Sequence, residues 1–303
     1  MNFLLAIFAI IIVLFNLPAH YSFILGLGVA LTTKIDSSTK DTISTYSKKL
    51  LQLSIILLGA KLDLQTILTV GKNGIILTSM SILSIFFFGH WLARIFKVHS
   101  PLSTLITSGT SICGGSAISA VSPVVKASSI DLATSMGVVF LLNAVAIFIF
   151  PTLGRSLSLS QEQFGLWAAL AIHDTSSVVA ATQLYGEKAL EVGTTLKLLR
   201  SLWIIPVVML LTLKNGKKNK VKLPLFILGF LGFSVVFSAF DELSFLVPVI
   251  STISKISLSI VLFSIGLTLS KERVSKIGVA PFLMAFFLWF FTIITSYFLV
   301  HLA

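Results

Sequence analysis

Three short groups of polar residues interrupt long apolar stretches of this chain, and their residue types could bind or carry a charged species. They are Gly114-Gly115-Ser116, the pair His173-Asp174, and Lys197 with Arg200 three positions later. An ionisable residue deep in an apolar helix is costly, so a functional role is the default interpretation. Because histidine changes its charge near neutral pH, His173-Asp174 is a candidate for proton transfer.

Each group also has a structural alternative. Two adjacent glycines can serve close helix packing. Asp174 can cap a helix while His173 bonds a carbonyl group. Lys197 and Arg200 share one helix face, and near a helix end both could extend toward the polar interface. The sequence alone leaves these alternatives open.

The composition places these residues in a membrane. Of the 303 residues, 56% are hydrophobic and 11% are charged, and the mean hydropathy is +1.02. Soluble domains carry about 25% charged residues. This composition excludes a cytosolic enzyme and a disordered protein, and the single cysteine, Cys113, excludes an internal disulfide framework. We therefore predict an all-α polytopic membrane protein that forms one transmembrane domain over residues 1–303.

Apolar runs long enough for membrane helices predict ten or eleven transmembrane helices. The first two runs are short and close together, so they could form one broken span. The predicted segments are 3–15, 20–33, 46–60, 74–93, 101–124, 130–151, 163–182, 194–213, 223–240, 247–269 and 277–301.

The basic residues of the loops indicate the orientation. Alternate loops carry fifteen Lys and Arg residues on one side and four on the other. The richer side is expected in the cytoplasm. With eleven spans, the N-terminus lies in the cytoplasm and the C-terminus outside. The Lys-rich run at 214–222 is then an orientation signal, and no nucleic-acid partner is expected.

Two pairs of similar stretches suggest an internal repeat. Residues 53–64 resemble 258–269, and the polar-centred stretches 107–126 and 169–188 occupy corresponding positions. Interrupted segments in two halves are typical of inverted-repeat transporters. We therefore predict repeat-related pieces at 46–151 and 163–301, with two crossing discontinuous helices near 101–124 and 163–182.

The interrupted segments predict a site for a small anion. Helix N-termini facing the membrane centre would present free N–H groups to it. Three cations, including Lys255, against Asp174 alone would leave a local charge of +2, which suits a divalent anion. Asn143 is a candidate supporting residue. The expected substrate-binding residues are Thr110, Ser111, Cys113, Gly114, Gly115, Ser116, His173, Asp174, Thr175, Ser176, Lys197, Arg200 and Lys255.

Four stretches, at 109–127, 140–151, 173–181 and 194–206, together resemble the YeiH-type family of bacterial integral membrane proteins, which are labelled as sulfate exporters. The resemblance implies an inner-membrane transporter with a fold similar to the inverted-repeat transporters of the bile acid and sodium–proton antiporter type. After His173-Asp174 this chain has Thr175, Ser176 and Ser177 where many relatives have a run such as Val-Ala-Gln. That difference bears on selectivity.

Three functions follow as hypotheses. The first is a secondary transporter for sulfate, sulfite or a sulfonate, with His173 and Asp174 coupling it to protons. The second keeps the fold but makes Asp174 the ion-binding carboxylate of a cation–proton antiporter, with Lys255 as its partner. The third is an intramembrane enzyme using Cys113 with His173 and Asp174.

Transport is favoured, so no enzymatic activity, cofactor or metal is expected. Cys113 has no histidine at ligand spacing. The chain has no GxxxxGK[ST] motif, so an ATP-driven mechanism would need a separate subunit. The expected partners are the lipid bilayer, the anion and a coupling proton or cation, and small residues on several helices permit a homodimer.

Overall fold

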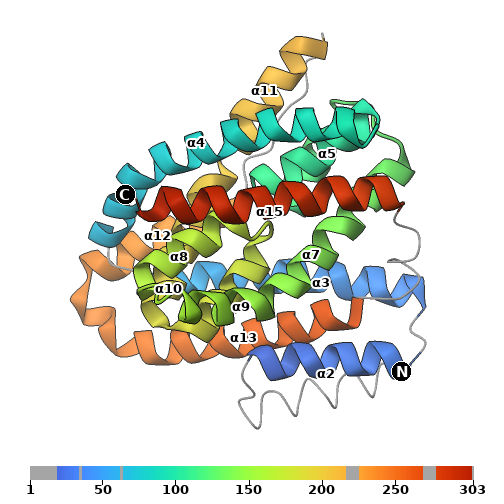
Figure 1. Cartoon of the computed structure of the whole chain (residues 1–303). Coiled ribbons are helices and arrows are strands. Elements are labelled where there is room, and N and C mark those ends of the chain that lie inside the picture. Colours follow the sequence, from blue (N-terminus) through green and yellow to red (C-terminus); the bar gives the residue numbers. More distant parts are fainter. Residues whose placement is uncertain (1–18, 34–35, 62–63, 216–224, 269–277, 302–303) are drawn as a thin grey trace. The chain divides into compact units, whose positions relative to one another are not determined.

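The computed structural model describes residues 19–33, 36–61, 64–215, 225–268 and 278–301, and all regular elements in these ranges are helical (Figure 1). Five helical stretches in this part are long and apolar enough to cross a membrane: Gly74–Ile95, Ile130–Ser156, Glu187–Leu213, Glu242–Ser264 and Val279–His301. The predicted class, an all-α polytopic membrane protein, is confirmed. The predicted segment 3–15 lies outside the described residues, and the number of spans stays a prediction.

The chain forms two compact units, each built from sequence segments that are far apart. Unit one comprises residues 1–67 and 224–271, and unit two comprises residues 68–223 and 272–303. The predicted repeat boundaries and the inverted relation of the halves stay predictions.

Unit one packs α13 (Val247–Thr268) against α2 (Ala19–Thr32) and α3 (Ser37–Leu58). The Ser254 hydroxyl on α13 donates to the Ser54 carbonyl on α3 (2.9 Å). The two similar stretches 53–64 and 258–269 therefore belong to elements that pack together. The remaining elements of this unit are η1 (Gly59–Lys61), α12 (Leu225–Ala239) and η2 (Asp241–Leu246).

Unit two contains all three polar groups singled out from the sequence, whereas Lys255 belongs to unit one. Its elements are α4 (Leu64–Ile95, of which the first four residues belong to unit one), α5 (Ser100–Ser111), α6 (Gly115–Val121), α7 (Ser129–Ser156), α8 (Gln161–Ala171), α9 (Thr175–Tyr185), α10 (Glu187–Ser201), α11 (Ile204–Asn215) and α15 (Val279–His301).

Aromatic packing and close glycine contacts hold unit two together. Helix α15 runs alongside α4, where Phe88 and Phe291 stack with ring centroids 4.1 Å apart (Figure 1). Helices α8 and α10 approach so closely that a Cβ on Gly165 would lie 3.0 Å from the Gly193 nitrogen. A larger side chain at Gly165 would therefore force these helices apart.

Two helices of unit two are interrupted, as predicted. One break separates α5 from α6 at residues 112–114, and the other separates α8 from α9 at residues 172–174. Both fall in the middle of the predicted segments 101–124 and 163–182. The prediction of two discontinuous helices is confirmed.

Three predicted helix starts are wrong by several residues. Helix α4 begins at Leu64 rather than 74. Helix α3 begins at Ser37 rather than 46, because the Asp36 carboxylate accepts a hydrogen bond from the Thr39 nitrogen (3.1 Å) and caps the helix. Helix α10 begins at Glu187 rather than 194, directly after Gly186. In α3 and α10 a polar first turn hides the helix from an analysis based on apolar runs.

Candidate functional site

The two helix breaks meet at Gly114 and Asp174. Gly114 has a φ of 64°, a backbone conformation that side chains other than glycine rarely adopt. A Cβ built on Gly114 would lie 3.2 Å from the Asp174 Cβ and 3.3 Å from its Cα. Glycine is therefore needed at residue 114 both for the turn and for the close approach to the second break.

Asp174 is the N-cap of α9. Its carboxylate accepts hydrogen bonds from the Ser176 backbone nitrogen (3.1 Å) and from the Ser176 hydroxyl. This is the usual use of an Asp at a helix start, since it satisfies an N–H group that has no partner within the helix. The negative charge at the start of α9 is thus supplied by the protein itself.

Asn143 on α7 holds the second break in place. Its side-chain oxygen accepts the backbone N–H groups of His173 (3.2 Å) and Asp174 (3.4 Å), and it lies 3.3 Å from the His173 Nδ1 atom. Asn143, predicted as a supporting residue, therefore bridges α7 and the break between α8 and α9.

His173 is fully buried at this break. Among the described residues, its Nε2 atom and the Asn143 side-chain nitrogen have no hydrogen-bond partner. The imidazole ring lies near Trp289 of α15, with ring centroids 6.2 Å apart. Trp289 itself donates to the Ala171 carbonyl (3.1 Å). Two unpartnered polar atoms are thus buried beside the interrupted backbone.

Arg200 on α10 is fully buried and joins both breaks. Its guanidinium group directs its five N–H groups at acceptors on three other helices. The acceptors are the carbonyls of Ser111 (2.6 Å), Thr110 (3.5 Å), Ala169 (3.1 Å) and Leu170, and the Ser81 hydroxyl (3.5 Å). These carbonyls close α5 and α8, where the last C=O groups have no partner within the helix.

Lys197, one helical turn before Arg200, acts at the second break only. Its ammonium group is also fully buried and donates to the carbonyls of Ile172 (2.7 Å) and Ala169 (3.3 Å). A cation at a helix C-terminus offsets the partial negative charge that collects there. Lys197 and Arg200 together therefore neutralise the C-terminal ends of both interrupted helices.

Other predicted site residues are distributed unevenly. Cys113 is a buried free thiol at the first break, Thr175 and Ser176 are buried at the start of α9, and Ser116 is exposed. Lys255 lies on α13 in unit one, and its side chain lies outside the described residues. The charged side chains described at the two breaks are Lys197, Arg200 and Asp174, which leaves one net positive charge with a neutral His173.

Four polar residues on α5 and α10 have buried hydroxyls without a described partner, and three of them were missed in the sequence. Ser108 and Thr110 on α5 and Thr194 and Thr195 on α10 bury hydroxyl oxygens that have no partner among the described residues. Only Thr110 was predicted as a site residue. The pair Thr194-Thr195 lies about one turn before Lys197, but hydroxyl residues are too common in membrane helices for this position alone to indicate a site.

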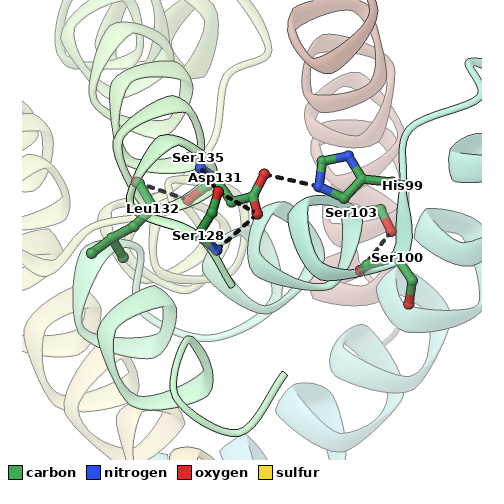
Figure 2. A network of polar contacts seen from close by, with 7 residues as sticks. All are labelled: His99, Ser100, Ser103, Ser128, Asp131, Leu132 and Ser135. Atoms are coloured by element: carbon green, nitrogen blue, oxygen red, sulfur yellow. Dashed lines mark hydrogen bonds and ion pairs between the residues drawn. The ribbon is translucent and has the colours of Figure 1, made fainter. Parts of the chain in front are cut away.

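A second polar cluster joins the starts of α5 and α7 (Figure 2). The His99 Nε2 atom lies 2.8 Å from an Asp131 carboxylate oxygen, and the His99 side chain is 59% exposed. Asp131 also accepts from the Ser128 backbone nitrogen (2.9 Å) and completes a capping box for α7. This cluster, in which His99 is exposed and Asp131 is buried, therefore ties α5 to α7 at a helix end.

Within the residues that the structure describes, no group of three or more His, Cys, Asp or Glu side chains could hold a metal ion. The chemistry available at the two breaks is thus that of two buried cations, one carboxylate, one imidazole and several hydroxyl and amide groups.

Comparison with known proteins places the chain in a family. The family model described as "Conserved hypothetical protein 698" matches residues 1–285. A UPF0324 membrane protein of Bdellovibrio bacteriovorus is 44% identical over 272 residues, which cover 88% of this chain and 84% of the relative. UPF0324 membrane proteins of Geobacter sulfurreducens and Vibrio vulnificus are 43% and 42% identical, covering 80% and 88% of this chain and 79% and 87% of the relatives.

No solved structure matches the chain. The match to UPF0324 relatives confirms the resemblance to the YeiH-type family, and a membrane location agrees with the apolar helices described above. The chain belongs to the UPF0324 family of membrane proteins, the family described as conserved hypothetical protein 698.

Proposed function

We propose that this protein is a secondary transporter that carries a small anion, of the sulfate, sulfite or sulfonate class, through the meeting point of the two broken helices. The observation that carries the proposal is the placement of Lys197 and Arg200 on the C-terminal carbonyls of α5 and α8. The two cations stand against the single described carboxylate of Asp174, so the net formal charge of the side chains at the breaks is positive. A positive, poorly solvated region attracts anions.

The unpartnered polar atoms support a polar cargo. The hydroxyls of Ser108, Thr110, Thr194 and Thr195 and the Asn143 amide nitrogen are buried without described partners. A buried polar group without a partner destabilises the fold, whereas a bound oxyanion would accept hydrogen bonds from such donors. Irregular backbone at membrane depth is typical of regions that line a transport cavity.

The hydrogen bonds that Arg200 makes within the protein change the role expected for it. Because its five N–H groups already face protein acceptors, Arg200 would act on the anion through its charge rather than through direct hydrogen bonds. We propose that hydroxyl and amide donors contact the anion and that the two cations supply the positive electrostatic potential that attracts it. Transport would occur in a bacterial inner membrane, with the N-terminus in the cytoplasm.

A cation–proton antiporter is the second candidate, because the partly buried carboxylate of Asp174 lies at the meeting point of the breaks. Against it, Asp174 already caps α9, and two cations bond carbonyls at the same breaks. The excess of positive charge makes a cation the less favourable cargo.

Thermal unfolding of the purified protein tests the proposal. We would compare sulfate, sulfite, taurine, chloride, sodium and potassium. A ligand that binds only the folded state adds about 2.7 kcal/mol at about 100 Kd. We expect a saturable stabilisation by one oxyanion in the wild type. Stabilisation by sodium or potassium, with none by an anion, would contradict the proposal and favour the antiporter.

A matched pair of variants gives the control. K197M removes a cation at the breaks, and K188Q removes an exposed cation that lies 3.7 Å from Glu191 on the surface of the same helix. Each variant is compared with its own ligand-free baseline, so a general loss of stability does not enter the result. We expect K188Q to keep the anion response and K197M to lose most of it.

A further inference from the structure

The contacts of Asn143 determine which nitrogen of the buried His173 ring carries a proton. The side-chain oxygen of Asn143 accepts the backbone N–H groups of His173 and Asp174, so the amide cannot be turned around without facing its NH₂ group toward two donors. The same oxygen lies 3.3 Å from the His173 Nδ1 atom. Nδ1 must therefore be the protonated nitrogen of the neutral ring.

The other nitrogen, Nε2, is then an acceptor. It is buried and has no donor among the described residues. A neutral imidazole keeps a lone pair at this position, which can take up a proton. Asp174 differs, because its Oδ2 atom accepts both described hydrogen bonds that cap α9, and hydrogen bonds donated to a carboxylate favour its charged form.

We infer that the His173 Nε2 atom binds a proton together with the transported anion, while Asp174 keeps its negative charge as the cap of α9. This inference rests on the proposed anion transport and names the group that couples transport to protons. It predicts that proton and anion move in the same direction.

The charges around His173 give the sign of the coupling. Lys197 bonds the Ile172 carbonyl next to His173, and Arg200 bonds the end of α8, so a protonated imidazole would add a third cation near the breaks. Asp174 is the described carboxylate there, while the Cys113 thiol, Asn143 and Trp289 are uncharged neighbours at the breaks or beside the ring. A bound anion offsets the repulsion among the cations. Each ligand therefore strengthens the binding of the other by the same factor.

Calorimetry of the full-length protein tests this inference. Sulfate and methanesulfonate are the probes, because neither takes up a proton between about pH 5 and pH 8, the range in which histidine titrates. Titrations in two buffers with different ionisation enthalpies give the number of protons taken up per anion bound. We expect an uptake that approaches one proton, and an anion Kd that rises by up to about tenfold per pH unit as His173 loses its proton.

Three variants assign the proton. In H173Q we expect no proton uptake and an anion Kd that stays at the weak, high-pH value at every pH. D174N should still take up the proton. H99Q is the matched control, because it removes an exposed histidine of the same unit and should behave as the wild type does.

The outcomes separate this inference from the proposed function. If neither probe binds to the wild type, the anion site itself is contradicted. If an anion binds without proton uptake, or if D174N loses the uptake while H173Q keeps it, only the assignment to His173 is contradicted. If H173Q does not fold, D174N decides between the two side chains, because the inference requires this variant to keep the uptake.

Discussion

The break between α5 and α6 is made by the backbone, and the break between α8 and α9 is made by side chains. At the first, Gly114 takes a left-handed conformation and no side chain caps α6. At the second, Asp174 caps α9, and Asn143 holds the two N–H groups of the turn. One break thus supplies the close approach and the other supplies the titratable groups, although both lie in similar sequence contexts.

The cations show the same asymmetry. Arg200 bonds the last carbonyls of both α5 and α8, whereas Lys197 bonds α8 and the turn after it. The two breaks are therefore chemically unequal. Arg200 bonds both of them and Lys197 bonds only the second, so comparing mutations of the two cations separates the contributions of the breaks to stability.

The largest effect is expected for R200M, because this change leaves carbonyls at both breaks without a donor. A buried acceptor that loses its donor costs about 1–3 kcal/mol, and R200M leaves several carbonyls in this state. K197M should cost less, since it affects the second break only. Chemical denaturation of the purified variants measures both values, and equal losses in the two variants would show that Arg200 does not act on the first break.

The next effect is expected for G114A, which tests the backbone-made break. A left-handed conformation in a residue other than glycine costs about 1–3 kcal/mol, and the added Cβ would press on Asp174. G115A is the matched control, because its Cβ would meet only Phe140 at an ordinary 3.4 Å and the residue has no positive φ. Similar midpoints of thermal unfolding for both variants would contradict the role given to Gly114.

A smaller effect is expected for D174A, which removes the side-chain cap of the second break. Loss of an N-cap costs about 0.5–2 kcal/mol. We expect the upper part of this range, since no bulk water replaces the cap at membrane depth. S160A removes the equivalent cap of α8, which is exposed, and should cost less. A larger loss in S160A would argue that the second break is well hydrated.

The smallest effect is expected for H99Q, because the described ion pair of His99 is with Asp131 and not with a residue at either break. His99 is exposed although Asp131 is buried, and an ion pair with a solvent-exposed partner contributes about 0–1 kcal/mol. Asp131 keeps its bonds to Ser128 in this variant. The midpoint of thermal unfolding should change little. A loss comparable to that of D174A would instead give the cluster in Figure 2 a structural weight similar to that of the cap at the second break.

The sequence predicted the helical class and the positions of both breaks, because glycine pairs and charged residues stand out in apolar segments. It did not predict what Lys197 and Arg200 bond, because their acceptors are mostly backbone carbonyls, which carry no residue signature. The spacing of the two cations indicated a shared helix face but not which helix that face meets. Lys255 was grouped with them by charge, although it belongs to the other unit.

The contacts of Arg200 also have a mechanical consequence. Arg200 on α10 bonds residues of α4, α5 and α8. The close contact between Gly165 and Gly193 also holds α8 against α10. Pulling α5 away from α8 would break several hydrogen bonds at once in a medium that offers no replacements. We therefore expect these four helices to move as one rigid block, so that access to the breaks changes only when the parts around this block shift.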